Sequence, residues 1–398
     1  MTETSHDPAA IHDPPSLVLA AIAAQVIGGL ITQMSPFVIS GLMHGFSLSG
    51  RDAAFVGSAE LLTLAATAIA IAPALPRLSC RSTGLAAVGL TLLADGASIF
   101  CASWISFVLL RALAGMGEGA LYAMSLSVVA CRSRSPDRVY GYFQIVWALG
   151  SAALFLIGGD LTAAFAYRGI LALIAGVTAA LTPLLLLVPD TPLRASDETL
   201  EGAAPASPLL GMSTFIAIVL YLTASAAIYM FTAPLGERAG LDTSSVGYAL
   251  TVASLVGLAG AGAATAINVR WGRATPISGF CAGFSAVAVV LCLSHDATAY
   301  LVSLVASVAV FYFSIPYLFG LAAALDRSGR WAAAAGSAYL IGFAAGPMAG
   351  GAMLGLGGYP GIAALCVAMT LVVWGLTMFV HTRLKRTARA SLAARALA

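Results

Sequence analysis

Arg111 and Glu118 are the two residues of this sequence whose chemistry is least expected in their surroundings. Both lie in an apolar run from about Trp104 to Val129, which is long enough to cross a bilayer as a helix. At helical spacing Arg111, Glu118 and Tyr122 share one face, which must look into protein or into a water-filled cavity. Ionisable groups inside a membrane span are costly and indicate a pathway for a solute or for protons.

Two further carboxylates, Glu60 and Asp95, lie in neighbouring apolar runs. At about 1.5 Å per residue, Glu60, Asp95 and Arg111 each lie roughly 10 Å from the same end of their helices, so they can pair. Glu118 lies nearer the bilayer centre, where desolvation disfavours its charged form and Arg111 favours it, so alternating hydration would load and unload a proton. We predict Glu118 and Arg111 as proton-coupling residues, with Glu60 in reserve. The alternative is that these charges only fix helix packing.

Composition identifies the class of protein that must position these groups. The chain has 398 residues, of which 60% are hydrophobic and 9% charged, and its mean hydropathy is +0.95. An average soluble domain has about 25% charged residues, so these values indicate a multi-pass membrane protein. A net charge of +2, with basic residues scattered over short loops, argues against a nucleic-acid partner.

Catalytic and metal-binding patterns are missing from the sequence. The 6 cysteines are far apart, with no C-x-x-C pair and no histidine cluster nearby, so we expect inert thiols, no metal and no cofactor. We find no P-loop and no nucleophile beside a base, and the polar segments are too short for a catalytic domain outside the membrane. We therefore expect neither an enzyme nor an ATP-driven pump.

Apolar segments of suitable length predict an all-α membrane protein with twelve transmembrane helices. The predicted spans are residues 16–43, 53–75, 82–102, 104–131, 139–160, 169–188, 209–234, 244–268, 275–294, 297–324, 331–356 and 359–381. Residues 1–15 are predicted as a polar tail and residues 382–398 as a basic tail, both cytoplasmic.

A polar interruption at residues 189–208 divides six predicted helices from six. We interpret it as a cytoplasmic linker between an N-terminal bundle, residues 16–188, and a C-terminal bundle, residues 209–381. An offset of 193 residues aligns the first-half loops with those of the second half. An offset of 192 aligns glycines of the fifth and eleventh helices. The sequence therefore predicts two pseudo-symmetric six-helix bundles.

Basic residues predict the orientation of the helices. With the N-terminus inside, the loops and tail on that side hold 15 of the 19 basic residues, whereas the opposite loops hold only Arg51, Arg168 and Arg238. The positive-inside rule then places both termini in the cytoplasm. We expect a multi-pass protein of the cytoplasmic (inner) membrane.

Two short motifs accompany this helix count. The fourth helix carries R-x-x-x-G-x-G beginning at Arg111, and the loop after the eighth helix carries Arg270, Gly272 and Arg273, with Arg77 at the matching place in the first half. With the six-plus-six organisation, these motifs resemble the major facilitator superfamily of secondary transporters over nearly the whole chain. The resemblance implies a role of the arginine in proton coupling, as in drug/proton antiporters of that family, and a gating role for the loop.

Glycine recurs every four residues in the eleventh helix, at Gly342, Gly346 and Gly350, and Pro347 interrupts its backbone hydrogen bonds. Stripes of this kind give smooth faces on which helices approach closely. The stripe is either static packing or a face that slides during alternating access. On both interpretations we predict Gly346, Pro347 and Gly350 as gating and packing residues.

Aromatic residues replace charges in the second half, whose predicted helices contain no Asp, Glu, Lys or Arg. We interpret these aromatics, with two glutamines of the first half, as the walls of a solute site; the alternative is packing or anchoring at the membrane interface. The predicted solute-binding residues are Gln33, Tyr122, Gln144, Tyr229, Phe311 and Tyr339.

Together these observations predict a monomeric, proton-coupled secondary transporter of a small amphipathic or aromatic solute in the lipid bilayer, with export slightly favoured. Three carboxylates and one arginine favour protons or a cationic solute over a polyanion. One alternative is proton-linked uptake of an organic acid, with Arg111 binding the carboxylate of the solute. Another is a membrane sensor in which the charges only brace the bundle.

Overall fold

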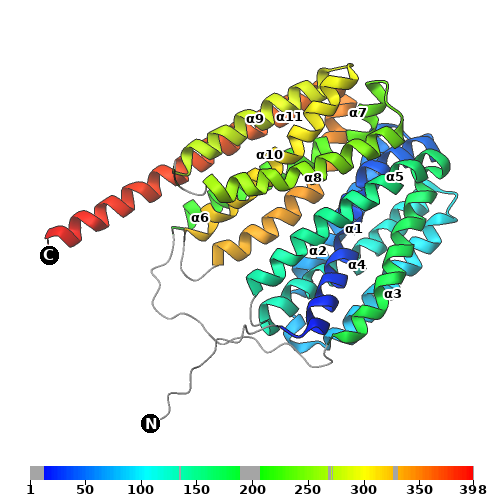
Figure 1. The fold of residues 1–398 in the computed structure, drawn as a ribbon, viewed down its shortest axis with the longest axis horizontal. Coiled ribbons are helices and arrows are strands. Elements are labelled where there is room, and N and C mark those ends of the chain that lie inside the picture. The colour runs from blue at the N-terminus through cyan, green and yellow to red at the C-terminus, as the bar shows by residue number, and fades with distance from the viewer. Residues whose placement is uncertain are drawn as a thin grey trace, which may run out of the picture.

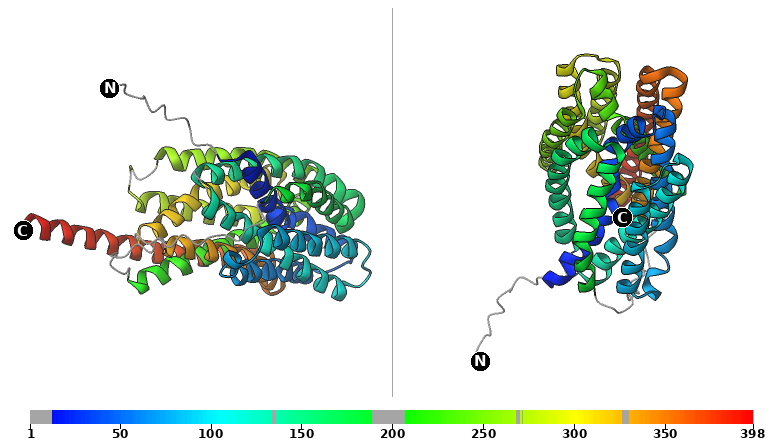
Figure 2. Two further views of the ribbon diagram at one scale, coloured as in Figure 1. Left: turned by 90° about the horizontal axis from the view of Figure 1, so that it is seen from below. Right: turned by 90° about the vertical axis from the view of Figure 1, so that its right-hand side faces the viewer.

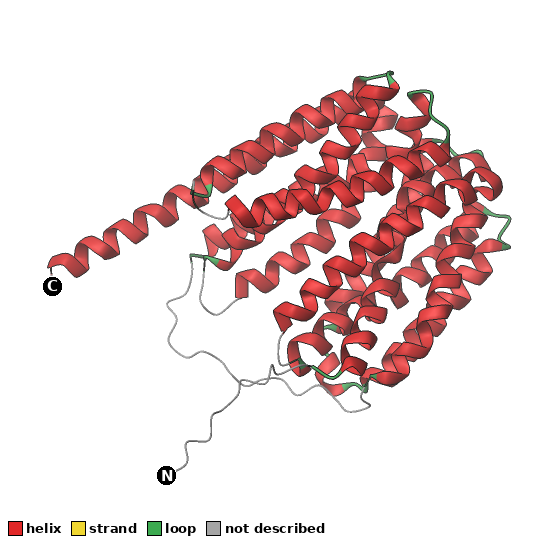
Figure 3. Cartoon of the chain, in the orientation of Figure 1, coloured by secondary structure: helices red, strands yellow, loops and turns green. Residues whose placement is uncertain are grey.

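A computed structural model describes residues 13–133, 136–188, 207–267, 270, 272–325 and 330–397. Helices joined by short connections make up this part of the chain (Figure 3). Within it, 10 helical elements are long and apolar enough to cross a membrane. Residues 1–12 of the predicted tail and 189–206 of the predicted linker lie outside the described residues.

Five helical elements and two short 3-10 segments form the N-terminal half. Their bounds are α1 (Pro15–Gly45), α2 (Gly50–Ile71), η1 (Leu75–Arg77), α3 (Cys80–Ile99), α4 (Trp104–Arg132), α5 (Pro136–Leu181) and η2 (Thr182–Leu187). A serine precedes α2 and α3, and its hydroxyl accepts a hydrogen bond from a backbone N–H of the first turn. Such caps satisfy donors that have no partner within the helix, so the sequence sets where α2 and α3 begin.

Six elements form the C-terminal half. Their bounds are α6 (Pro208–Tyr229), α7 (Thr232–Arg238), α8 (Thr243–Ile267), α9 (Ala274–Leu293), α10 (Ala297–Ala323) and α11 (Arg330–Leu397). Asp296 caps α10 by accepting a hydrogen bond from the N–H of Ala299. The predicted basic tail continues α11 as a helix to Leu397, because its alanine, arginine and leucine residues favour helix.

The elements α5 and α11 each contain two membrane-spanning helices. The backbone leaves the helical region at Ala166 in α5, where φ is 51°, and at Gly358 in α11, where φ is 63°. Beyond Ala166 the chain folds back, so that Gly169 lies against the carbonyl of Leu161. An unbroken helix would separate residues eight apart by about 12 Å. The 10 elements therefore contain the twelve predicted helices.

The two turns occupy corresponding places in the halves. Ala166 and Gly358 are 192 residues apart, which is the offset that aligns the glycines of the fifth and eleventh helices. Gly361 lies against the carbonyl of Met353, just as Gly169 lies against the carbonyl of Leu161 in the first half. The same helix, turn and helix is therefore repeated, and the prediction of pseudo-symmetric bundles is confirmed.

The two bundles lie side by side, with the N-terminal half in blue to green and the C-terminal half in green to red (Figure 1). The start of α1 and the end of α11 lie at one end of the helices (Figure 2). We call this end, where α6 also begins, the linker side, and the end with the turns at Ala166 and Gly358 the hairpin side. Across the boundary, α2 packs on α11 and α5 packs on α8.

The predicted glycine stripe of α11 faces α6 inside the C-terminal half. A Cβ at Gly342 or Gly346 would collide with α6, at Val219 or Ala226 respectively. Gly350 lies against the same helix, and Pro347 is buried nearby. The stripe therefore permits close packing within one half, whereas the neighbouring Gly351 faces Ala54 of α2 across the boundary.

Replacing Gly346 by valine should lower the thermal stability of the detergent-purified protein. The added carbons have no room against Ala226, and overpacking of a tight contact costs about 1–3 kcal/mol. Gly375→Ala in the same element is the control, because a Cβ there meets nothing within 4 Å. Helix propensity then predicts no loss of stability. Equal melting temperatures of Gly346→Val and wild type would show that α6 and α11 can move apart at this contact without loss of stability.

Candidate functional site

Four ionisable side chains gather inside the N-terminal half, on α2, α3 and α4. They are Glu60, Asp95, Arg111 and Glu118, which we call the buried charge cluster. Their relative exposures are 0–1%. The cluster is therefore shielded from lipid. This agrees with the expectation from the sequence that the face shared by Arg111 and Glu118 looks into protein or water.

Arg111 holds the cluster together. One terminal guanidinium nitrogen lies 2.9 Å from Glu60 Oε1 and the other 2.8 Å from Asp95 Oδ1. The Ser98 hydroxyl accepts two further hydrogen bonds from Arg111, one from Nε at 3.2 Å and one from a terminal nitrogen at 2.8 Å. The ring of Phe107 lies 5.6 Å from the guanidinium carbon. Of the two pairings expected from depth in the membrane, the structure has both.

Glycines of the R-x-x-x-G-x-G motif bring α4 close enough for these contacts. Gly115 lies against the backbone carbonyl of Glu60, and Gly119 against that of Leu64, so α4 touches the backbone of α2. Gly117 packs on α3 beside Thr91. Without Cβ atoms the helices approach closely, and the side chains of Glu60 and Asp95 can reach the guanidinium.

Glu118 has no partner of its own. Neither of its carboxyl oxygens makes a hydrogen bond to a described residue, and the same holds for Glu60 Oε2 and Asp95 Oδ2. With all three carboxyls ionised, the cluster would carry two more negative than positive charges in a site sealed from water. An unpaired buried charge is very costly, so the cluster is held at least cost when two of its three carboxyls carry a proton and the third balances the charge of Arg111.

The buried charge cluster does not line the space between the halves. The sequence allowed the face of Arg111 and Glu118 to look either into protein or into a water-filled cavity, and neither residue lines the two cavities between the halves. This is because the glycines of α4 turn this face toward α2 and α3. Tyr122, one turn beyond Glu118, does line the larger cavity.

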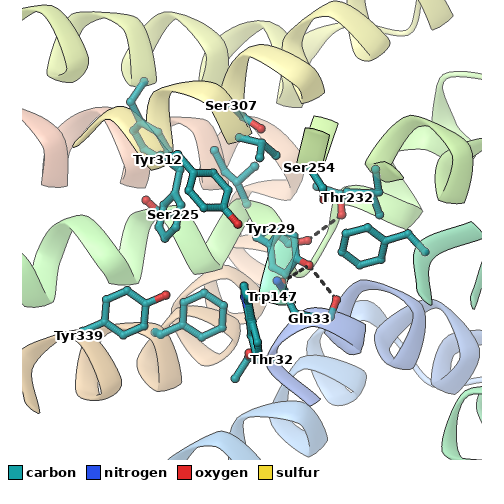
Figure 4. Close-up of a pocket in the computed structure, with 17 residues that line it drawn as sticks. Thr32, Gln33, Trp147, Ser225, Tyr229, Thr232, Ser254, Ser307, Tyr312 and Tyr339 are labelled. Carbon is teal, nitrogen blue, oxygen red and sulfur yellow. Dashed lines mark hydrogen bonds between the residues drawn. The ribbon is translucent and has the colours of Figure 1, made fainter. Parts of the chain in front are cut away.

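Two neighbouring cavities lie between the halves. The larger, which we call the vestibule, has a volume of about 580 Å³ and reaches residues near the linker side, such as Pro73, Phe143 and Ser337. The smaller, about 100 Å³, is the inner pocket, which reaches toward the hairpin side at Thr232 (Figure 4). Six residues line both cavities, among them Trp147. The inner pocket is therefore the closed end of a path from the linker side.

Five of the six predicted solute-binding residues line these cavities. Gln33 and Tyr229 line the inner pocket, Tyr122 the vestibule, and Phe311 and Tyr339 both. The side chain of the sixth, Gln144, lies outside the described residues.

Sequence reasoning missed several lining residues, including Trp147, Phe319 and Phe343. Phe319 follows Phe311 by eight residues and Phe343 follows Tyr339 by four, so each shares a helix face with a predicted residue. Helical spacing from the predicted aromatics therefore contained the signal that identifies them.

A hydrogen-bonded link between the halves crosses the inner pocket. The Tyr229 hydroxyl of α6 donates to the Gln33 backbone carbonyl at 2.7 Å and lies 3.3 Å from Gln33 Oε1 of α1. The amide nitrogen of Gln33 donates to Ser151 Oγ of α5 at 2.7 Å. The side-chain amide of Gln33 is thus fixed by partners from both halves.

Glu237 of α7 joins the halves beyond this pocket, on the hairpin side. Its Oε1 accepts hydrogen bonds from Ser40 of α1 at 2.8 Å and from Thr243 at 3.1 Å, and His44 Nε2 lies 3.7 Å from Oε2. Gly159 of α5 also packs directly on α8. The halves are therefore in contact on the hairpin side, while the vestibule lies between them toward the linker side.

Replacing Glu237 by alanine should loosen the hairpin side. A hydrogen bond to a charged group contributes about 1.5 kcal/mol or more, so we expect roughly a tenfold shift away from the closed contact. Spin labels at Ala102→Cys and Thr298→Cys, exposed positions of the two halves, would report a larger population of long distances. Asp52→Asn is the control, because this exposed carboxylate bonds to Ser49 within its own half. An unchanged distance distribution for Glu237→Ala would count against the link.

The predicted gating residues lie at the linker side. Arg77 ends η1 and is exposed, and Arg270 is exposed at the matching place of the second half. Gly272 has φ of 70°, a conformation that favours glycine, and Arg273 directly precedes α9. These residues therefore surround the end of the protein toward which the vestibule extends.

Comparisons with known proteins agree with this arrangement. The sequence model of the Major Facilitator Superfamily matches residues 21–326. No curated protein sequence matches the chain.

Solved structures with the same fold are found. A bacterial homolog of the human lysosomal transporter Spinster, inward-facing and unoccupied, is 15% identical, with a TM-score of 0.69 over 94% of this chain and 98% of that chain. The same homolog in its inward-facing, occupied form is also 15% identical, with a TM-score of 0.70 over 96% of this chain and 98% of that chain. A D-xylose-proton symporter is 15% identical, with a TM-score of 0.68 over 90% of this chain and 97% of that chain.

Proposed function

The chain belongs to the major facilitator superfamily, a family of secondary transporters, and we propose that it couples protons to the movement of a small organic solute. One observation supports the coupling: Glu118 is fully buried with no hydrogen-bond partner among the described residues, one helical turn from Tyr122 in the vestibule wall. A carboxyl so placed takes up a proton when sealed and releases it when water or a counter-charge reaches it. The D-xylose-proton symporter, which has a similar fold, is named for this kind of coupling.

We assign the solute to the inner pocket and its entrance to the vestibule. The excess of basic residues at the linker side supports a cytoplasmic location for this side of the protein, in the inner membrane of a cell. The solute then enters from the cytoplasm, and release on the other side requires the contacts around Glu237 to open. We propose export as the direction of transport, because the Arg111 motif resembles that of drug/proton antiporters. Arg77, Arg270 and Arg273 would close the linker side in the opposite state.

Uptake of an organic acid bound by Arg111 is the less favoured alternative. The guanidinium already binds Glu60, Asp95 and Ser98, its exposure is 0%, and it lines neither cavity. A solute carboxylate would have to displace buried partners of the same charge.

Reconstitution tests the proposal as a whole. A thermal-shift screen on the purified monomer identifies a binding solute, and proteoliposomes containing a pH-sensitive dye then report proton movement when that solute is added. Coupled transport predicts saturable proton flux that requires the solute. A membrane sensor would bind the solute with no flux of either species, and that result would reject the proposal.

A further inference from the structure

The inner pocket is uncharged and strongly aromatic. Of the 17 residues that line it, eight have aromatic rings, and among the described residues that line it or the vestibule none is Asp, Glu, Lys, Arg or His. Rings come from both halves, such as Trp147 of α5 and Phe311 of α10. The lining residues of both halves are therefore uncharged.

The charged residues near the inner pocket are not placed to pair with a charged solute. The buried charge cluster is 0–1% exposed and lies behind the backbone contacts that join α4 to α2. Glu237 and His44 lie on the hairpin side, where Glu237 is bonded to Ser40. A charged solute in the inner pocket would thus lose its hydration shell with no opposite charge to replace it, which is heavily unfavourable.

Ten of the 17 lining residues carry a hydroxyl, an amide or an indole N–H, and several of these groups are already used. Gln33 is bonded to Ser151 and Tyr229, and the hydroxyls of Thr232 and Ser307 donate to backbone carbonyls of their own segments. Ser225 lines the pocket and is 8% exposed; its Oγ is buried, lies near Tyr221 and makes no hydrogen bond of ordinary geometry to a described residue. The pocket can therefore satisfy several uncharged polar groups of a solute.

We infer that the inner pocket selects an electrically neutral solute with a flat aromatic body and uncharged hydrogen-bonding groups, one of them bound by Ser225. This deepens the proposed function and rests on it. It replaces the sequence-based preference for a cationic solute, because the three carboxylates behind that preference do not face the cavities. Since the solute carries no charge, each proton moved would carry net charge across the membrane.

Matched probes test this selectivity. Three compounds share an indole ring and differ in charge: 3-(2-hydroxyethyl)indole is neutral, tryptamine is a cation and indole-3-acetate is an anion. Binding to the detergent-purified full chain is followed by calorimetry, and matched naphthalene and phenyl sets repeat the comparison. We expect the neutral member of at least one set to bind roughly tenfold or more tighter than its charged analogues, because only it avoids an unpaired buried charge.

Two variants locate the binding. Phe311→Ala removes a ring from the pocket wall and should weaken the neutral probe roughly tenfold, in line with the contribution of an aromatic contact. Phe100→Ala is the control, since this ring is 85% exposed and lines neither cavity. Ser225→Ala should weaken probes that carry a hydroxyl more than the same rings without one.

Each result decides the inference. Tighter binding of a charged member, or no saturable binding by the neutral member of any set, overturns it. Equal effects of Phe311→Ala and Phe100→Ala overturn the assignment of the solute to these cavities, both of which Phe311 lines. Proton coupling is measured separately by solute-dependent proton flux. A charged solute that still moves protons would reject neutrality alone, and a neutral solute without proton flux would reject coupling alone.

Discussion

Glu118→Gln should abolish solute accumulation driven by a pH gradient while the protein still folds and still exchanges solute. Glutamine keeps the shape of the side chain and removes its exchangeable proton. The wild-type carboxyl has no hydrogen-bond partner among the described residues and no ion pair, so the substitution breaks no contact. On this proposal the sealed carboxyl carries a proton, so the neutral glutamine adds no buried charge and thermal stability should be equal or higher.

The expected effect is large. Each pH unit corresponds to 1.36 kcal/mol per proton, so a gradient of about two units supports roughly 100-fold accumulation by one proton. Glu118→Gln should lower this to the ratio set by passive equilibrium. Exchange of labelled for unlabelled solute, which needs no net proton movement, should continue.

Asp160→Asn is the matched control, because Asp160 is an exposed carboxylate of the same half. Both variants are reconstituted in proteoliposomes and compared for gradient-driven accumulation and for exchange. Wild-type accumulation by Glu118→Gln would remove this residue from the coupling mechanism. Loss of exchange together with accumulation would show that Glu118 serves solute binding or opening instead.

Element lengths and the repeat were readable in the sequence for physical reasons. A bilayer demands apolar runs of about 20 residues, so the spans of α1 to α4 were predicted closely. The tight turns at Ala166 and Gly358 lie where predicted spans were separated by short gaps, and their spacing follows the repeat. The predicted pairing of Arg111 rested on depth alone, which helix geometry fixes at about 1.5 Å per residue.

Rotation of the helices relative to one another was not readable. The face of Arg111 and Glu118 was known to avoid lipid, yet protein and water satisfy that requirement equally. The structure decides between them because Gly115 and Gly119 press α4 against the backbone of α2. Small residues mark contact faces within a half as well as between halves, so the spacing of glycines alone does not identify the partner helix.

Replacing Arg111 by methionine should destabilise the protein severely. Glu60 and Asp95 would lose the only cationic partner that they have among the described residues, in a site with 0–1% exposure. Removing one partner of a buried ion pair costs about 3–5 kcal/mol, a large share of the stability of a typical protein. We expect most of the expressed Arg111→Met protein to aggregate when it is extracted in detergent, as measured by size-exclusion chromatography.

A triple variant separates bracing from coupling. Combining Arg111→Met with Glu60→Gln and Asp95→Asn removes every unpaired charge that the single substitution creates, and replacing a buried ionic group by neutral residues is often harmless to stability. The triple variant should therefore recover a monodisperse, folded protein. If the charges only brace the bundle, it will also recover accumulation driven by a pH gradient.

Coupling through the cluster predicts the opposite for the triple variant. The arginine influences Glu118 by its charge alone, so a folded protein without that charge should exchange solute at near wild-type rates yet fail to accumulate it. Thermal stability and solute exchange therefore measure the structural role of the cluster, and accumulation measures its role in proton coupling. A triple variant that folds and accumulates solute normally would leave Arg111 with a purely structural role and Glu118 as the sole proton carrier of the cluster.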